Sequence, residues 1–365
     1  MGSQTYPCVS VLMPSDGDVV VPSRQTFLIV WLKALPLVLL AFSTVTFNTM
    51  VLWMFKVKKS LRSCKNIYLG SLAMADLIIG VSMFPAAVQQ LKGQVEWLPF
   101  VWCRVYLVVR QSALYVSLLS LLLITADRWW SIHYPFSYRT RRRKKNAFLA
   151  VGGVWLIGFS LQTIPVAVWD FLIPKETPSL NSSSPDLDLV LKTFPACELP
   201  FSHNISFVAI VSGIQYFVPL VAMLTLNCSL YLGILGRKKI QIRRSLNSSD
   251  KKSSLRPSKD GDELAKSLLV KQDRRAACWL GLLVIVFLVC WLPHMIVGVL
   301  ITTRHNGVPL WARDVTFWFL LANSAINPLL YGFFNKEIRE AFKQWMYGGS
   351  MRRARGKNAL FIYGI

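Results

Sequence analysis

One aspartate, Asp76, interrupts an otherwise apolar run, LAMADLIIG, with no other charge close to it in sequence. A charged side chain at the centre of a membrane helix costs about 2.5–3.5 kcal/mol on insertion scales, so such residues are candidates for function. A carboxylate surrounded by hydroxyls and amides can hold a small cation, and it can also be protonated. A hydrogen-bonded structural aspartate is the alternative. The partners that we expect come from other apolar runs: Asn48, Ser117, Asn323, Ser324 and Asn327.

The tripeptide Asp127-Arg128-Trp129 forms a second group of charges, at the end of another apolar run. Asp127 and Arg128 can form a local ion pair and nothing more. However, Asp273, at the start of a later run, offers Arg128 a second carboxylate. An arginine that can choose between partners on two helices is suited to a two-state switch.

The chain shows no pattern typical of an enzyme. We find no nucleophile–base constellation, phosphate-binding loop or metal-ligand cluster, and the four histidines are scattered. Seven cysteines in 365 residues are too few for a disulfide scaffold. We therefore expect binding rather than catalysis.

Long apolar segments must position these polar residues. Hydrophobic residues make up 53% of the chain and charged residues 16%, whereas soluble domains carry about 25% charge. A helix of roughly 20 apolar residues crosses a hydrocarbon core of about 30 Å. The sequence therefore predicts an all-α membrane protein, a seven-transmembrane helix bundle, with spans near 28–55, 66–90, 101–132, 147–170, 206–235, 275–302 and 313–334.

The basic residues predict the orientation of this bundle. Of 41 Lys and Arg residues, 32 lie in segments that face the cytoplasm if the N-terminus is outside, as the positive-inside rule favours. Two glycosylation sequons, at Asn181 and Asn204, then fall in the second outer loop. The net charge of +23 suits anionic lipid and an acidic or amphipathic partner at the inner face, and no nucleic acid is expected. We expect a multi-pass protein of the plasma membrane.

Four regions follow one another along the chain. Residues 1–27 form an extracellular N-terminal tail without a cleavable signal pattern, and 28–334 form the membrane domain, in which 237–270 is a flexible third cytoplasmic loop. Residues 335–346 predict an amphipathic helix on the membrane surface, and 347–365 form a basic cytoplasmic tail. The apolar stripe of the surface helix consists of Ile338, Ala341, Phe342, Trp345 and Met346.

A series of short motifs runs in order through the seven segments. It comprises Asn48, LAMADLIIG, Asp127-Arg128-Trp129, Trp155, Pro219, Phe287-x-x-x-Trp291-x-Pro293 and Asn327-Pro328-Leu329-Leu330-Tyr331. In this order and spacing, over about 300 of the 365 residues, the chain resembles the class A (rhodopsin-like) G-protein-coupled receptors. The resemblance implies a receptor that passes an extracellular small-molecule signal to a heterotrimeric G protein, with arrestin and receptor kinases as further partners.

The same resemblance implies roles for individual residues. The polar cluster around Asp76 would hold a sodium ion as an allosteric modulator, and no other cofactor is expected. Cys103 and Cys197 would form the disulfide that ties the third span to the second outer loop. The switch between receptor states would consist of Asp127, Arg128, Asp273, Phe287, Trp291, Asn327, Pro328 and Tyr331.

Within class A, the chain looks most like the amine receptors, nearest the third and fourth histamine subtypes, with muscarinic receptors next. The run FWFLLANSAINPLLYG, the SYRT after Tyr134-Pro135, and Asn227 carry this likeness. It implies coupling to an inhibitory-type G protein.

The amine-binding group of those receptors is missing from this chain. They place an aspartate seven residues after the outer cysteine of the third span, and here that position is Arg110. Gln215 stands where the histamine pair has a glutamate, and His294 stands where a tyrosine is usual. Two like charges about 4 Å apart repel by about 4 kcal/mol at an effective dielectric constant of about 20, so a ligand ammonium should bind poorly.

Three roles for Arg110 stay open. It can receive the carboxylate or phosphate of a ligand through paired hydrogen bonds. It can pair with Glu198, which follows Cys197, and so plug the pocket and leave an orphan or constitutively active receptor. It can also extend to the outer surface without a role. The residues expected to line the pocket are Arg110, Leu114, Gln215, Trp291, His294, Met295, Phe317, Trp318, Leu321 and Glu198.

Two functions of other classes compete with a receptor. A transporter or channel would need a polar stripe that is continuous through the bundle, whereas the polar residues here gather at mid-depth and at the inner edge. A silent scaffold that dimerises with signalling relatives is the other alternative.

Overall fold

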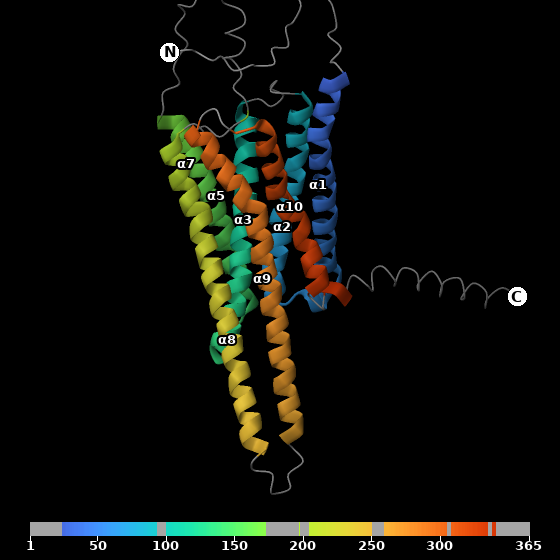
Figure 1. Ribbon diagram of the computed structural model, residues 1–365, viewed down its shortest axis with the longest axis vertical. Helices are drawn as coiled ribbons and strands as arrows, with labels where there is room; N and C mark the ends of the chain where they lie inside the picture. The colour runs from blue at the N-terminus through green and yellow to red at the C-terminus, as the bar shows by residue number, and fades with distance from the viewer. Residues whose placement is uncertain are drawn as a thin grey trace, which may run out of the picture.

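The computed structural model describes residues 24–92, 100–172, 197, 204–249, 259–304, 308–334 and 338–340. These residues form helices and contain no strand, which confirms the all-α fold. Figure 1 shows the helices side by side along the long axis of the molecule. In chain order the elements are α1 (Arg24–Val57), η1 (Lys59–Leu61), α2 (Cys64–Lys92), α3 (Phe100–His133), α4 (Pro135–Arg141), α5 (Lys144–Leu172), α7 (Ile205–Ser212), η2 (Gly213–Phe217), α8 (Val218–Ser249), α9 (Lys259–Arg304) and α10 (Leu310–Phe334).

Seven helical segments of the described residues make up the bundle. Within the described residues, six stretches are long and apolar enough to cross a membrane: Trp31–Val57, Asn66–Val88, Val101–His133, Lys144–Trp169, Ser206–Arg237 and Cys278–Ile301. The seventh predicted span is α10, which carries several polar residues but packs against α1, α2 and α9 and so completes the bundle. The central helix is α3, which contacts α2, α5 and α8.

Apolar and polar side chains are distributed as a lipid environment requires. Leu32 and Leu156, on the outside of the bundle, are 65% and 70% exposed. Asp76, Ser117 and Asn327 are buried inside it. This is the reverse of a water-soluble protein, and it places the polar residues where only other helices can satisfy them.

The contact of α3 with α5 depends on one glycine. A Cβ atom on Gly158 would lie 2.5 Å from Val116 Cγ2, so a larger residue would force the helices to move. Trp155 of α5 donates its indole N–H to Ser71 Oγ of α2 at 3.0 Å, and Ser71 is hydrogen-bonded to Ser120 of α3 at 3.1 Å. Close packing and these hydrogen bonds hold α2, α3 and α5 together.

The fifth span is irregular near its N-terminal end. A π-helical turn, Gly213–Phe217, separates α7 from α8. Pro219 has no N–H to donate to the carbonyl of Gln215 four residues earlier, so regular α-helical bonding cannot continue through this point. Turns of this kind are frequent at functional sites. This one places Gln215 in the interior, where 4% of its surface is exposed.

Most of the predicted flexible loop at 237–270 is helical. The helix α8 continues to Ser249, and α9 begins at Lys259. Extending an existing helix avoids the cost of nucleation, and residues 237–249 contain no Gly or Pro that would end it. Figure 1 shows both helices projecting beyond the rest of the bundle.

Three predicted regions lie largely outside the described residues. They are the tail 1–27, the surface helix 335–346 and the basic tail 347–365. Residues 338–340 of the surface helix are described and are helical. Ile338 is only 1% exposed, so the first residue of the predicted apolar stripe is buried.

Candidate functional site

The polar residues around Asp76 meet at the centre of the bundle. Ser117 Oγ of α3 donates to Asp76 Oδ1 at 2.8 Å, and Asn327 Nδ2 of α10 donates to Asp76 Oδ2 at 2.9 Å. Asn48 of α1 donates to the carbonyl of Ser324 on α10 at 3.1 Å. Asp76 has no exposed surface, so its carboxylate joins α2, α3 and α10 in the interior.

Arg110 packs between two aromatic rings. Its Cζ atom is 5.1 Å from the centre of the Tyr106 ring and 5.6 Å from that of Phe317 on α10. Its Nη1 donates to the Tyr106 hydroxyl at 3.1 Å, and that hydroxyl donates to the carbonyl of Ser82 on α2, also at 3.1 Å. The Nε atom of Arg110 is buried without a hydrogen-bond partner among the described residues. This packing does not fit a side chain that extends to the outer surface.

The charge of Arg110 is not neutralised within the described part of the chain. The ion pairs found there join Lys33 to Asp314 and Arg128 to Asp127. Arginine does not lose its proton in proteins, so the site carries a full positive charge. Glu198, the predicted internal partner, lies outside the described residues.

His294 lies beside Phe317, the ring that also contacts Arg110. The centres of the His294 and Phe317 rings are 5.8 Å apart, and His294 Nδ1 is 3.5 Å from Thr316 Oγ1. These contacts hold His294 of α9 against α10. Phe317 thus contacts both Arg110 and His294, which are two of the predicted pocket residues.

Gln215 is tied to α5 rather than left open to a ligand. It accepts a hydrogen bond from Gln162 Nε2 at 2.9 Å and donates to the carbonyl of Leu161 at 3.1 Å. Both glutamines are 4% exposed. The π turn of the fifth span and α5 are thus joined by a pair of buried amides, which fixes Gln215 in place.

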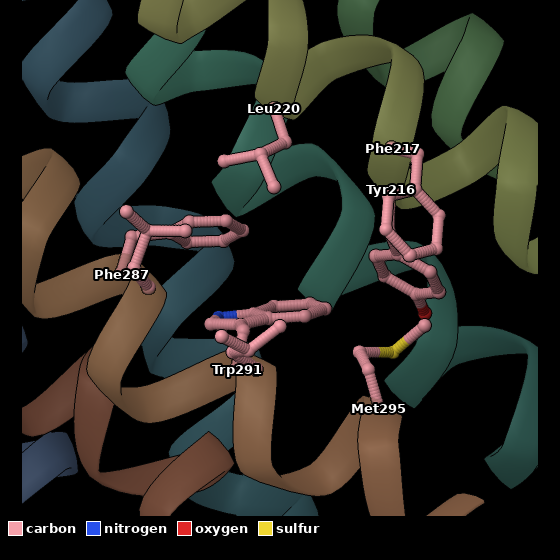
Figure 2. Close-up of a pocket in the computed structure, with 8 residues that line it drawn as sticks. Tyr216, Phe217, Leu220, Phe287, Trp291 and Met295 are labelled. Atoms are coloured by element: carbon pink, nitrogen blue, oxygen red, sulfur yellow. The ribbon is translucent and has the colours of Figure 1, made fainter. Parts of the chain in front are cut away.

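A small apolar cavity lies between the fifth and sixth spans. Figure 2 shows Trp291 between Phe287 and Tyr216, and the ring centre of each lies 5.0 Å from that of Trp291. Met295, one turn further along α9, lines the same cavity. The predicted switch residues Phe287 and Trp291 are therefore in contact with each other, and Trp291 also contacts Tyr216 of the π turn.

Asp127, at the end of α3, contacts two further groups. Arg128 Nη2 lies 3.7 Å from Asp127 Oδ2, in the predicted local ion pair. The hydroxyl of Tyr138, on α4, donates to the same carboxylate at 3.2 and 3.3 Å. Burial and the negative charge of Asp127 raise the pKa of Tyr138 to about 12, so its hydroxyl stays protonated at neutral pH. Asp273 lies in α9, but its side chain is outside the described residues.

The remaining predicted residues occupy different places. Trp318 lines a groove with Pro36 and Leu40 of α1 and is not among the residues around Trp291. The side chain of Tyr331 lies outside the described residues. Buried within the bundle are Leu114, Leu321, Asn323 and Pro328.

The end of the bundle where α3 begins carries the predicted disulfide. Cys103 of α3 is bonded to Cys197, which confirms this prediction. Asn204, the second sequon, is exposed and caps α7, where its side chain accepts from the backbone N–H of Phe207 at 2.9 Å. Asn181 lies outside the described residues.

Three residues of these sites were missed by sequence reasoning. Tyr106 precedes Arg110 by four residues, a helical spacing that brings side chains together, so it could have been found. Gln162 is a polar residue within an apolar span and could also have been found. The contact of Tyr138 with Asp127 depends on the path of α4, which no pattern in the sequence indicates.

Residues 47–331 match the family model described as the 7 transmembrane receptor (rhodopsin family). The chain belongs to this family. This receptor is 28% identical to the D(1) dopamine receptor of Carassius auratus over 319 residues, 83% of this chain and 84% of the relative. It is 28% identical to the D(1A) dopamine receptor of Xenopus laevis over 352 residues, 90% and 74% of the two chains. It is 24% identical to trace amine-associated receptor 8b of Rattus norvegicus over 303 residues, 83% and 82% of the two chains.

Family membership establishes the general function of this receptor. It is a multi-pass membrane receptor that takes a small-molecule ligand and signals through heterotrimeric G proteins, and it is not an enzyme. A receptor is thereby favoured over a transporter, a channel or a silent scaffold. The relatives named above are dopamine and trace amine receptors, so the predicted nearness to histamine and muscarinic receptors is not supported.

Proposed function

We propose that this receptor responds to a small anion, a carboxylate or a phosphate, that pairs with Arg110. The observation that carries the proposal is the packing of Arg110 between Tyr106 and Phe317 without a neutralising carboxylate among the described residues. Guanidinium presents five N–H donors in a planar fork that matches a carboxylate or a phosphate. Tyr106 accepts from one nitrogen of this fork, which leaves donors for a ligand.

The same charge disfavours the ligands that the names of the relatives suggest. An ammonium about 4 Å from the guanidinium would meet a repulsion of about 4 kcal/mol at an effective dielectric constant of about 20. That energy corresponds to a loss of affinity of nearly a thousandfold. The ligand of this receptor would therefore differ in charge from an amine, while the G-protein signalling of the family is kept.

A second candidate is a receptor whose pocket is closed by its own chain. Cys197 is bonded to Cys103, and their Cα atoms are 5.6 Å apart. Arg110 follows Cys103 by seven residues, about 10 Å along α3. Glu198, adjacent to Cys197 in sequence, would then be an internal acid close enough to pair with Arg110. In that case the receptor would signal without a ligand.

Two substitutions, Arg110→Gln and Glu198→Gln, distinguish these candidates. Purified receptor with acetate, succinate or inorganic phosphate is assayed for nucleotide exchange on a G protein and for its melting temperature. We expect Arg110→Gln to weaken the response to an activating anion about ten- to a hundredfold, because a hydrogen bond to a charged group contributes about 1.5–3 kcal/mol. Lys145→Gln is the matched control, because it removes an exposed positive charge from the first turn of α5.

Each outcome favours one candidate. If Arg110→Gln and Glu198→Gln both change ligand-free exchange, and no anion acts on the unmodified receptor, the internal plug is correct. If one anion acts and Arg110→Gln alone weakens it, the anion receptor is correct. Anion responses that Arg110→Gln leaves intact would contradict the proposal.

We also propose the finer partners and the orientation. The distribution of basic residues supports an N-terminus outside the plasma membrane and an inner face that binds an inhibitory-type G protein, arrestin and receptor kinases. Exchange assays that compare purified inhibitory-type and stimulatory-type G proteins test this coupling.

A sodium ion beside Asp76 is a further proposal of the same kind. Hard cations prefer oxygen ligands, and Asp76 and Ser117 supply a carboxylate and a hydroxyl. Asn327 Oδ1 is a buried oxygen without a hydrogen-bond partner among the described residues. This donor set fits a small cation, whose charge would balance that of the buried Asp76 carboxylate. Ser117 and Asn327 would hold the carboxylate in its orientation.

A further inference from the structure

The third and fifth spans are hydrogen-bonded to each other through three side chains near the end of α3. Trp129 Nε1 of α3 donates to Ser229 Oγ of α8 at 2.9 Å. His133 stacks on the Trp129 ring, with ring centres 4.9 Å apart. Its Nε2 is 3.4 Å from Ser229 Oγ, and its Nδ1 is 3.1 Å from the Trp129 carbonyl. The three side chains thus form a closed network between α3 and α8.

When His133 is neutral, the hydrogen bonds of this network have one consistent set of directions. A carbonyl oxygen only accepts, so His133 Nδ1 carries the proton and donates to Trp129. In the neutral imidazole Nε2 is then an acceptor, and the Ser229 hydroxyl donates to it. The same hydroxyl oxygen accepts from the Trp129 indole. Every polar side-chain atom of this part-buried network between the two helices therefore has a hydrogen-bond partner.

The close approach of α8 to α3 supports this network. A Cβ atom on Gly233, one turn after Ser229, would lie 3.0 Å from His133 Nε2. The absence of a side chain at Gly233 therefore lets the imidazole lie against α8. Arg237, one turn further along α8, donates to the carbonyl of Ile132. The contacts between the two helices thus repeat over two turns of α8.

We infer that Trp129, His133 and Ser229 form an interhelical clamp that positions the intracellular end of α8 against α3 and so sets the resting width of the G-protein-binding cleft. Trp129 directly follows Arg128, so the clamp adjoins the predicted switch. These are positioning residues, because they act through the placement of α8. The inference uses the G-protein signalling of the family and the intracellular placement of this end, and it does not depend on the ligand of Arg110.

Asn227 of α8 does not form a hydrogen bond that connects α8 to α3. Its Nδ2 donates to the carbonyl of Met223 in its own helix at 2.9 Å, and its Oδ1 is buried without a hydrogen-bond partner among the described residues. Ser229, two residues further along α8, makes the contact with α3 instead.

Four variants of the full chain test the clamp. Ser229→Ala removes the central oxygen, and Trp129→Phe removes the indole N–H but keeps an aromatic ring. Ser229→Thr keeps the hydroxyl and should rescue. Ser131→Ala is the matched control, because Ser131 donates to the carbonyl of Arg128 in its own helix at 2.8 Å.

Two measurements are made on each purified variant. The first is ligand-free nucleotide exchange on a G protein. The second is the distance between spin labels at Phe148 on α5 and Ile240 on α8, which are both exposed. For the labelling, the exposed free cysteines Cys228 and Cys278 are replaced by serine in all variants.

We expect Ser229→Ala and Trp129→Phe each to raise ligand-free exchange about fivefold, the change that corresponds to one ordinary hydrogen bond. The distance distribution should broaden in both. Ser229→Thr and Ser131→Ala should match the unmodified receptor. The effect of the double variant of Trp129→Phe and Ser229→Ala should be smaller than the sum of the two single effects, because both single variants remove the Trp129–Ser229 hydrogen bond.

Two results would overturn the clamp. One is exchange and distances in Ser229→Ala and Trp129→Phe that equal those of Ser131→Ala. The other is single-variant effects that add in the double variant. If a variant fails to fold, Gly233→Ala replaces it, because the new methyl group displaces His133 without removing a hydrogen-bonding group. It is expected to act in the same direction.

Discussion

Replacing Tyr106 by phenylalanine tests whether Arg110 is held in place for a ligand. The Tyr106 hydroxyl accepts from Arg110 Nη1 and donates to the Ser82 carbonyl, each at 3.1 Å. It therefore bridges the arginine to α2. Phenylalanine would keep the aromatic ring, whose centre lies 5.1 Å from the guanidinium carbon, and would remove only the bridge.

The size of the effect follows from that one hydroxyl. A hydrogen bond to a charged group contributes about 1.5–3 kcal/mol. Part of this is recovered, because the freed N–H of Arg110 can bind water or the anion itself. We therefore expect a net loss of about 1.4 kcal/mol, or a tenfold lower potency of an activating anion. Tyr106→Leu also removes the cation–π contact and should cost a further factor of about two to thirty.

The assay is a concentration–response curve of nucleotide exchange with an anion that activates the unmodified receptor. Tyr231→Phe is the matched control, because Tyr231 lies on α8 with 55% of its surface exposed. Surface expression and the melting temperature of Tyr106→Phe should stay close to those of this control. Equal potency of the two variants would refute the idea that Tyr106 holds Arg110 for the ligand.

Three further predictions concern other parts of the bundle. Asp76→Asn should abolish any rise in melting temperature that sodium chloride gives over choline chloride, and a retained rise would place the cation elsewhere. Tyr138→Phe should raise ligand-free exchange by the same factor at every pH from about 6 to 8. The reason is that the pKa of Tyr138 is raised from 10.0 to about 12, so its hydroxyl stays protonated throughout this range. A pH-dependent difference between Tyr138→Phe and the unmodified receptor within that range would contradict a neutral donor to Asp127. Gly158→Ala should lower the melting temperature by several degrees, since overpacking costs about 1–3 kcal/mol, whereas Gly152→Ala, with nothing within 4 Å of its Cβ, should not; equal melting temperatures would refute this packing.

Residues that break an apolar pattern could be identified from the sequence. Asp76 stands alone in an apolar run, and neutral polar residues in other runs were its only available partners, so its contacts with Ser117 and Asn327 could be predicted. The spans themselves were predictable because the thickness and apolar character of the bilayer determine their length and composition. Recognising them therefore requires no knowledge of the tertiary structure.

Contacts that depend on how helices rotate against each other could not be predicted. Trp129 and Ser229 are 100 residues apart, and neither breaks a pattern in its own span. The pairing of Gln162 with Gln215 depends on the π turn, which rotates the fifth span by an amount that no local motif specifies. Such contacts depend on how side chains pack between helices, and that packing is determined by many residues together rather than by any one motif.

Local motifs also proved a poor guide to the nearest relatives. The likeness to histamine receptors rested on a few residues of the last span and the second inner loop. The matches to dopamine and trace amine receptors extend over 303 to 352 residues. Motifs that position the switch residues have the same structural task in every receptor of the family. They therefore say little about which ligand a given receptor binds.

The most direct measurement compares the unmodified receptor with Arg110→Asp on one panel of ligands. The panel contains acetate, succinate, inorganic phosphate, dopamine, histamine and acetylcholine, and the readout is nucleotide exchange on a purified G protein. We expect the unmodified receptor to respond to an anion and to none of the amines, and Arg110→Asp to lose the anion response and gain a response to an amine. Activation of the unmodified receptor by an amine at low micromolar concentration, together with an unchanged amine response in Arg110→Asp, would contradict charge selection by Arg110.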